Sequence, residues 1–319
     1  HRSFCIRGAA DGFVSCHNLD ADDALPSYRI APIRLTVGAS LSVIYTSVKT
    51  IRARNANGSD DVAGANGAII EGRSLVDVSG VNLGAAAGLY WEPLADRSLR
   101  IGFSYTTQPG FGKQRLKGTL EQQFGTTAAV APAQDVDFIQ TFPDLFRLGA
   151  AWRVSPKVEL RADGYMIRWS KFKRQCIVNS GADCNVDPTG KDLTGGQVIG
   201  NIPREWSDSF GIRAGVGYFL SDVVELHGSL ATTSSPVSKS TIDASTIDSQ
   251  RVYFTLGGRF TVTEHVAFGA SANYIWFAPV DTQGENRLNE FVGASHTPSG
   301  DGKYRQAIFY LNANASYTF

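Results

Sequence analysis

The feature that most constrains the fold is an alternation of apolar with polar or small residues, repeated in segment after segment. In LTVGASLSVIY, residues 35–45, the apolar side chains fall mostly on odd positions, and FGIRAGVGY, residues 210–218, alternates in the same way. A period of two puts the apolar side chains on one face of a β-strand, whereas a helix requires a period near 3.6. About ten segments alternate in this way, and their lengths approach the ~9–11 residues with which a tilted strand crosses a bilayer. They are residues 35–45, 81–91, 99–106, 146–154, 158–166, 210–218, 224–230, 252–262, 266–274 and 307–319.

The connections alternate in length as well. Short turns occupy residues 91–98, 154–158, 219–223 and 261–265. Long polar segments, predicted as extracellular loops, occupy residues 53–74, 107–143, 171–206, 233–250 and 278–304. Short turns on one side and long loops on the other are typical of outer-membrane barrels. A soluble β-sandwich or β-barrel also alternates along its strands, but it does not require uniformly long strands and a tight turn at every second connection.

The sequence therefore predicts an all-β fold, a transmembrane antiparallel β-barrel in a bacterial outer membrane. Hydrocarbon offers backbone amides no partner, so only helices and closed sheets can span it. No run of about 18 apolar residues predicts a membrane helix. We expect residues 33–319 to form the barrel, and residues 1–32 to be the remnant of an extracellular loop with a short strand at ALPSYRI, residues 24–30.

Composition and motifs exclude several classes of function. The 30 basic and 30 acidic residues balance, which argues against a nucleic-acid partner. Of the 5 histidines only His227 falls in a predicted strand, and no set of residues from separate segments suggests a catalytic triad. We expect no enzyme activity, no cofactor and no metal site.

Four cysteines form two close pairs, Cys5 with Cys16 and Cys176 with Cys184. Both pairs lie in polar segments, and each could close a small loop as a disulfide in an oxidising compartment. A metal site is the competing interpretation, but neither pair has a second Cys or His pair at a zinc-like spacing. We predict both disulfides.

Two stretches resemble a known family most clearly, FPDLFRLGAAWRVSPKVELRADGYMIRWSKF, residues 142–172, and REWSDSFGIRAGVGYFLSDVVELHGSLATTSSPV, residues 204–237. Together with the order of segments from residue 28 to 319, they resemble the FadL–TodX family of outer-membrane transporters for hydrophobic compounds. The final strand ends on Phe319 and resembles an outer-membrane assembly signal. The resemblance implies a barrel of fourteen strands with an N-terminal hatch. This chain contains about 10–11 strands and no segment resembling the hatch, so we expect the hatch and the first strands to be missing from this chain.

The resemblance also implies a ligand site in a groove between two long extracellular loops, which here would be residues 53–74 and 107–143. Within 111–125 the apolar residues fall close together at helical spacing, with basic residues nearby. An apolar stripe beside cations suits an amphipathic acid, although the stripe could instead pack the loop onto the barrel rim. The predicted groove residues are Phe111, Leu116, Leu120, Phe124, Lys113, Arg115, Ile69 and Ile70.

Charged residues on the predicted inward faces, Arg161 and Arg213 among them, form a second candidate site. Arg161 could hold a ligand carboxylate inside the barrel, and so could Lys49 and Arg52, which lie where the family resemblance places basic lumen residues. The alternative role is ion pairing across the wall, because an unpaired enclosed charge is costly.

These observations predict passive uptake of hydrophobic small molecules, either long-chain fatty acids or aromatic hydrocarbons, by a protein that we expect to be a monomer. Its other partners would be the outer-membrane lipids and lipopolysaccharide. The alternative is a surface anchor or adhesion protein whose loops bind a partner. A general diffusion porin is a third possibility, and it would conduct ions.

Overall fold

The computed structural model describes residues 13–18, 27–53, 66–68, 72–124 and 131–318. Sixteen strands belong to one sheet, and β16 and β17 form a separate two-stranded sheet. The strands are β1 (Phe13–Asn18), β2 (Ser27–Ile30), β3 (Leu35–Ala53), β4 (Gly72–Trp91), β5 (Leu99–Thr106), β6 (Lys113–Phe124), β7 (Gln134–Thr141), β8 (Leu145–Ser155), β9 (Val158–Ile167), β10 (Arg174–Asn179), β11 (Val198–Pro203), β12 (Ser209–Phe219), β13 (Val224–Thr233), β14 (Arg251–Thr261), β15 (Val266–Phe277), β16 (Val280–Asp281), β17 (Lys303–Tyr304) and β18 (Ala307–Tyr317). Four short 3-10 helices are η1 (Ala31–Ile33), η2 (Pro109–Phe111), η3 (Trp169–Lys171) and η4 (Gly293–Ser295). Among the described residues, no helix is long and apolar enough to cross a membrane.

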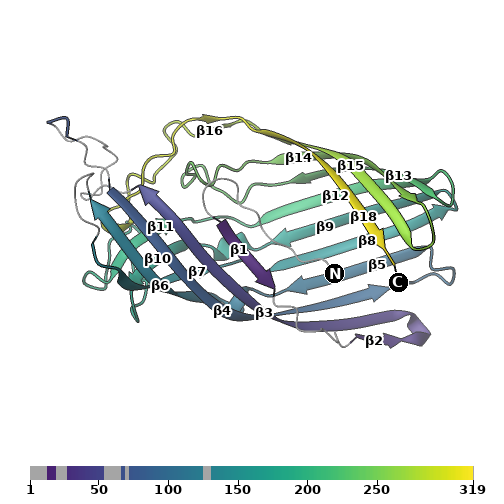
Figure 1. The fold of residues 1–319 in the computed structure, drawn as a ribbon, viewed down its shortest axis with the longest axis horizontal. Helices are drawn as coiled ribbons and strands as arrows, with labels where there is room; N and C mark the ends of the chain where they lie inside the picture. The colour runs from purple at the N-terminus through teal and green to yellow at the C-terminus, as the bar shows by residue number, and fades with distance from the viewer. Residues whose placement is uncertain (1–12, 19–26, 54–65, 69–71, 125–130, 319) are drawn as a thin grey trace.

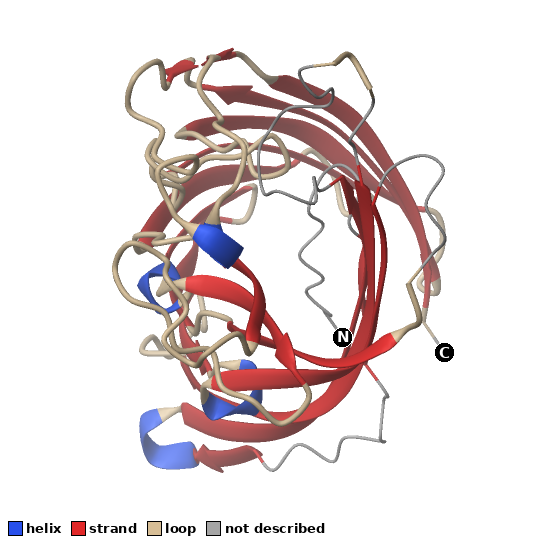
Figure 2. Cartoon of the chain, turned by 90° about the vertical axis from the view of Figure 1, so that its left-hand side faces the viewer, coloured by secondary structure: helices blue, strands red, loops and turns tan. Residues whose placement is uncertain are grey.

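Each of the ten segments predicted from the alternation contains a strand. They are β3, β4, β5, β8, β9, β12, β13, β14, β15 and β18. All the pairings in the large sheet are antiparallel, and the strand order β5-β8-β9-β12-β13-β14-β15-β18 runs along one wall. The wall strands lie nearly side by side in Figure 1, and the sheet curves round strongly in the end view of Figure 2. The predicted all-β antiparallel fold is confirmed.

The outward face of the wall is a continuous apolar belt. Leu148 is 57% exposed, Ile212 is 62% exposed and Leu256 is 72% exposed. A water-soluble protein does not present such a surface over strand after strand, whereas a lipid-facing wall requires it. The alternation seen in the sequence is thus the alternation between the lipid and the lumen.

The sheet divides at β4. Along one edge β4 pairs with β3 over nearly its whole length. Along the other edge residues 72–79 pair with β6, while residues 86–91 pair with β5. On one side the wall continues through β5, β8, β9 and β12. On the other side the sheet continues through β6, β7, β10 and β11, which we call the extracellular part because they lie in the loops predicted to be extracellular.

The chain passes between the two parts at four short interruptions, which we call the break row. It comprises residues 107–112, 142–144, 168–173 and 204–208. Pro109, Pro143 and two positive-φ glycines, Gly110 and Gly112, occur in it. Proline removes a ladder donor, and these glycine angles lie outside the strand region, so the ladders are interrupted here.

The predicted loops 107–143 and 171–206 therefore contain four strands, β6, β7, β10 and β11. In particular, residues 113–124 form a strand, and the helix suggested by their spacing is wrong. Residues four apart share a face in a strand as well as in a helix, so the spacing of Leu116 and Leu120 could not distinguish the two.

Candidate functional site

The inward face of the wall carries a hollow of about 750 Å³. Its walls come from β4, β5, β8, β9, β12 and β13. The bottom of the hollow is formed by small residues at inward positions in neighbouring strands, namely Gly102, Gly149, Ala151 and Gly215. The charged residues that line it are Arg100, Arg147, Glu159, Arg161, Asp163 and Arg213.

Glycines on the inward face make room for long side chains from the next strand. A Cβ atom at Gly211 would lie 2.2 Å from Cζ of Tyr165. At Gly257 it would lie 2.5 Å from Nε2 of His227. These glycines therefore allow Tyr165 and His227 to lie across the wall, which explains why the polar face of the sequence is so rich in glycine.

Most of the lumen charge is paired. Arg161 donates to Glu159 at 2.6 Å and to Glu225 at 3.1 Å, and Arg100 donates to Glu159 at 2.6 Å. Arg161 was predicted to face the lumen, and it lines the hollow. Its guanidinium already has two carboxylate partners, so its arrangement resembles wall-to-wall ion pairing.

Arg213 is different from the other arginines of the hollow. It is exposed, lines the hollow, and makes no ion pair or hydrogen bond within the described residues. Asp163 lies opposite Arg213 in the β9–β12 ladder, yet its buried Oδ2 atom has no hydrogen-bond partner among the described residues. The hollow thus contains one guanidinium that an added anion could use. Sequence reasoning placed Arg213 on the inward face but could not tell that it would stay unpaired.

The other two predicted lumen residues lie on opposite faces of β3. Lys49 shares the outward face of β3 with Tyr45 and Ile51, and it donates to Asp77 at 2.8 Å. The lumen position predicted for Lys49 is therefore wrong, because strict alternation along β3 points it away from the lumen. Arg52 lies on the inward side of the same strand, outside the charged residues of the hollow.

Above the hollow, the extracellular end of the inward face is closed by an apolar core. Leu116 is 0% exposed and Leu120 is 2% exposed. Val48 of β3, Ile177 of β10 and Ile199 of β11 pack against this core. Its fully buried members are Val76, Val78, Leu116, Leu120, Val136 and Phe138.

The structure does not bring the predicted groove residues together. Leu116 and Leu120 are interior residues of the core, while Phe111 and Phe124 are exposed outside it. Lys113 and Arg115 lie on the opposite face of β6 from Leu116, where both approach Asp183. The remaining two predicted residues, Ile69 and Ile70, lie outside the described residues.

A row of polar side chains, of which Gln114 and Gln140 are buried, lies between the apolar core and the hollow. We call Gln114, Gln140 and Gln175, on β6, β7 and β10, the glutamine ladder. Gln140 donates to Gln114 at 3.4 Å and Gln175 donates to Gln140 at 3.1 Å. At one end Gln114 approaches Thr46 of β3 at 3.5 Å. Sequence reasoning missed this row, although all three glutamines fall on the inward positions of their strands.

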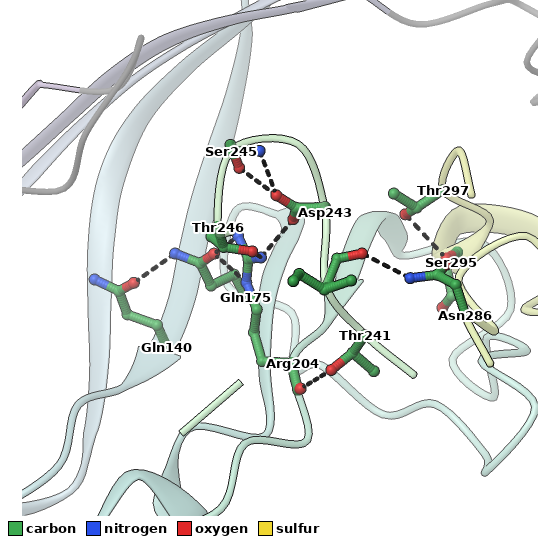
Figure 3. A network of polar contacts seen from close by, with 11 residues as sticks. Gln140, Gln175, Arg204, Thr241, Asp243, Ser245, Thr246, Asn286, Ser295 and Thr297 are labelled. Atoms are coloured by element: carbon green, nitrogen blue, oxygen red, sulfur yellow. Dashed lines mark hydrogen bonds and ion pairs between the residues drawn. The ribbon is translucent and has the colours of Figure 1, made fainter. Parts of the chain in front are cut away.

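At its other end the glutamine ladder is closed by a buried ion pair, seen in Figure 3. Arg204 donates to Gln175 at 2.7 Å and to Asp243 at 2.6 Å. Its side chain is only 8% exposed. Burial raises the pKa of the Asp243 carboxyl, but the Arg204 guanidinium and nearby hydroxyl groups outweigh burial and hold the pKa below its usual range.

Asp243 belongs to the loop 234–250, which also contacts the last extracellular loop. Asn286 donates to the carbonyl of Ile242 at 2.7 Å, and Thr241 donates to the carbonyl of Arg204. The extracellular loops are therefore fastened to one another and, through the glutamine ladder, to the wall strand β3.

Cys176 and Cys184 form a disulfide that ties β10 to the following loop. Cys176 is fully buried, in a second apolar cluster on the outer face of the extracellular part. Cys5 lies outside the described residues, as does the side chain of Cys16, so the second predicted disulfide stays a prediction. Within the described residues, no group of three or more His, Cys, Asp or Glu side chains is placed to hold a metal ion.

Comparisons with known proteins agree with this architecture. Residues 17–319 match the model of a family described as outer membrane protein transport protein (OMPP1/FadL/TodX). A search of curated proteins finds no match.

Among solved structures, a FadL homologue from Pseudomonas aeruginosa aligns with a TM-score of 0.68 at 16% identity, covering 96% of this chain and 67% of that one. The toluene transporter TbuX from Ralstonia pickettii aligns with a TM-score of 0.56 at 14% identity, covering 92% and 66% respectively. The toluene transporter TodX from P. putida gives 0.59 at 15% identity, covering 92% and 67%. These likenesses show the fold, and the chain spans about two thirds of the length of the structures it matches.

Proposed function

The chain belongs to the OMPP1/FadL/TodX family of outer-membrane transport proteins, and we propose that it carries long-chain fatty acids inward without chemistry. The family consists of transport channels for hydrophobic compounds and is not enzymatic. The single observation that favours a fatty acid over an aromatic hydrocarbon is Arg213. A toluene-like ligand has no anionic group that a guanidinium could bind, whereas a fatty acid has a carboxylate.

In this proposal the carboxylate of the ligand binds in the hollow and its chain runs along apolar surface elsewhere in the lumen. The hollow supports this because four arginines and only two carboxylates line it. Removing a charged hydrogen-bond partner from a ligand site costs roughly 1.5–3 kcal/mol, or about ten- to a hundredfold in affinity.

Uptake of labelled oleate into liposomes that contain the full chain tests the transport function. We expect saturable uptake, with little ion conductance in planar bilayers. A surface anchor would give no uptake, and a general diffusion porin would conduct ions.

The role of Arg213 is tested by Arg213→Gln. We expect at least tenfold weaker oleate binding and unchanged toluene binding. Arg259→Gln is the matched control, because Arg259 is also exposed and unpaired within the described residues but lies outside the residues of the hollow. Equal loss in both variants, or no loss in Arg213→Gln, would contradict a carboxylate site at Arg213.

A further inference from the structure

The break row lies where the outward apolar belt ends. Just below it, Leu148 and Phe210 are 57% and 55% exposed on the outward face. Just above it, β7 is buried on both faces, with Asp137, Phe138 and Ile139 all buried in succession. On β8 and β12 the exposed apolar side chains stop at this level, so on this side of the wall the break row marks the outer edge of the hydrocarbon layer.

An aromatic cluster occupies the same level. Phe142, Trp169, Phe172 and Trp206 come from three of the four interruptions in the break row. The rings of Trp169 and Trp206 lie 4.9 Å apart, and those of Phe172 and Trp206 also lie 4.9 Å apart. Phe172 is buried and the ring of Trp206 also lies beside the Arg204 guanidinium, so these rings pack the break row together.

The helix η3 is fixed at this edge by polar contacts to the outward side of the wall. Arg168, the residue before η3, donates through Nε to Asp144 at 2.6 Å, and Tyr105 donates to the same carboxylate at 2.9 Å. The backbone N–H of Ser170 donates to Asp208 at 2.9 Å. These contacts therefore fix the position at which residues 171–174 leave the wall.

Four cations lie in the break row or directly beside it, namely Lys113, Lys171, Lys173 and Arg174. Lys171 and Lys173 are exposed, and neither they nor Arg174 make an ion pair within the described residues. Lys113 is 56% exposed and reaches Asp183 only at 3.7 Å. Of the acidic side chains at the break row, Asp144 is paired with Arg168 and Asp208 accepts from Ser170, leaving Glu205 exposed.

The strand register places Lys113 and Arg174 in one cross-strand row. Lys113 lies opposite Thr141 of β7, and Cys176 lies opposite Ile139, so Arg174 lies level with Thr141 on its other side. Two strand spacings separate the two backbones, which is about 10 Å. Exposed cations at the top of an apolar belt, of which Lys113 is only loosely paired with Asp183, complement anionic groups at the surface of a membrane.

We propose that Lys113, Lys171, Lys173 and Arg174 form a docking site for the phosphate groups of an outer-leaflet glycolipid of the lipid A type. The acyl chains of such a lipid would run down the apolar belt while its phosphorylated sugars rest at the break row. Lysine provides a point charge and arginine a two-pronged donor, and both suit phosphate.

The test is a lipid titration of the full chain in detergent micelles, followed by native mass spectrometry. The probes are bisphosphorylated lipid A, dephosphorylated lipid A and inorganic phosphate. We expect Lys171→Ser/Lys173→Ser to weaken binding of the bisphosphorylated lipid by at least tenfold, since each lysine near an anionic surface contributes about fivefold. Lys171→Arg/Lys173→Arg should retain binding.

The matched control is Arg97→Asn/Lys157→Ser, which removes two exposed cations from turns between wall strands, β4–β5 and β8–β9, away from the break row. It should bind like the unaltered chain, and dephosphorylated lipid A should bind all variants equally weakly. Equal affinity of both double variants, equal loss in both, or equally tight binding of inorganic phosphate alone would overturn the proposal. Oleate uptake is measured in the same variants, and we expect it to be unchanged, so this site and the transport proposal can fail separately.

Discussion

The lipid-facing wall and the extracellular part are built from the same antiparallel strands but are stabilised in different ways. In the wall, one face meets lipid and the other meets the lumen, and large apolar side chains such as Leu148 are exposed. In the extracellular part, β7 is buried on both faces, and Leu116 and Cys176 are completely enclosed. A side chain in the wall therefore has lipid as its packing partner, whereas one in the extracellular part depends on its protein neighbours. The same substitution should cost much more in the second region than in the first.

The largest expected effect comes from breaking the buried ion pair of the extracellular part. Asp243→Ala leaves the Arg204 guanidinium buried without its anion, and losses of this kind cost about 3–5 kcal/mol. We expect that loss in the free energy of unfolding, measured by denaturant titration in lipid vesicles.

The wall provides the matched measurement for this ion pair. In Arg161→Gln the half-exposed Arg161 is lost, but Glu159 keeps Arg100, so the cost should be at most about 1 kcal/mol. Equal costs in the two variants would mean that Arg204 and Asp243 are better hydrated than their burial indicates.

A second comparison uses one residue type in both regions. Leu116→Ala should lower the free energy of unfolding by roughly 3 kcal/mol, because it opens a cavity in a core that is closed on all sides. In Leu148→Ala lipid can fill the space, and the loss should be well below that. Denaturant titration of both variants under one lipid condition decides the matter, and a larger loss at Leu148 would refute the proposed difference.

The disulfide of the extracellular part should have an intermediate effect. Cys176→Ser/Cys184→Ser opens a loop with a sequence separation of 8 residues, for which loop entropy predicts a loss of roughly 2–3 kcal/mol. We expect faster proteolysis between residues 180 and 197 and unchanged protection of β12–β15. Faster cleavage in the wall turns as well would show that the two regions unfold together.

These contrasts explain what could be predicted from the sequence. The wall strands were identified because lipid and lumen impose opposite chemistry on alternate residues, as in residues 210–218. The strand β7 was missed because burial on both faces removes that alternation, as the polar Asp137 and Gln140 within it illustrate. The strand β6 was missed because the spacing of Leu116 and Leu120 also fits a helix.

The candidate site residues could likewise be predicted in the wall but not in the extracellular part. Arg161 and Arg213 could be assigned to the inward face because alternate residues of a strand share a face. Lys49 was misplaced because its assignment came from the family resemblance rather than from this alternation. No local pattern could show that Gln114, Gln140 and Gln175 meet, since they come from three strands of which none was predicted.

A smaller effect should appear on acidification. The folded-state pKa of Asp243 lies below its usual range, so its contribution to stability is fully present above the unfolded-state value of about 4. It is lost as the pH falls below that value and through the folded-state pKa. The free energy of unfolding should therefore decline below about pH 4, and Asp243→Asn should remove the part of this decline that Asp243 contributes. If the free energy of unfolding of Asp243→Asn declined below about pH 4 as much as that of the unaltered chain, other carboxyl groups would be responsible for the decline.

The smallest effect is expected at Lys49, on the outward face of the wall. Lys49 and Asp77 are exposed partners, with side chains 67% and 45% exposed, so water already satisfies both charges when the pair is broken. Lys49→Gln should leave both the free energy of unfolding and oleate binding unchanged within error, in contrast to Arg213→Gln. We expect this difference because the alternation of side chains along β3 directs Lys49 away from the lumen, whereas Arg213 lines the hollow. Weaker oleate binding in Lys49→Gln would mean that the ligand reaches the outward surface of β3, and it would move the binding path from the hollow to that surface.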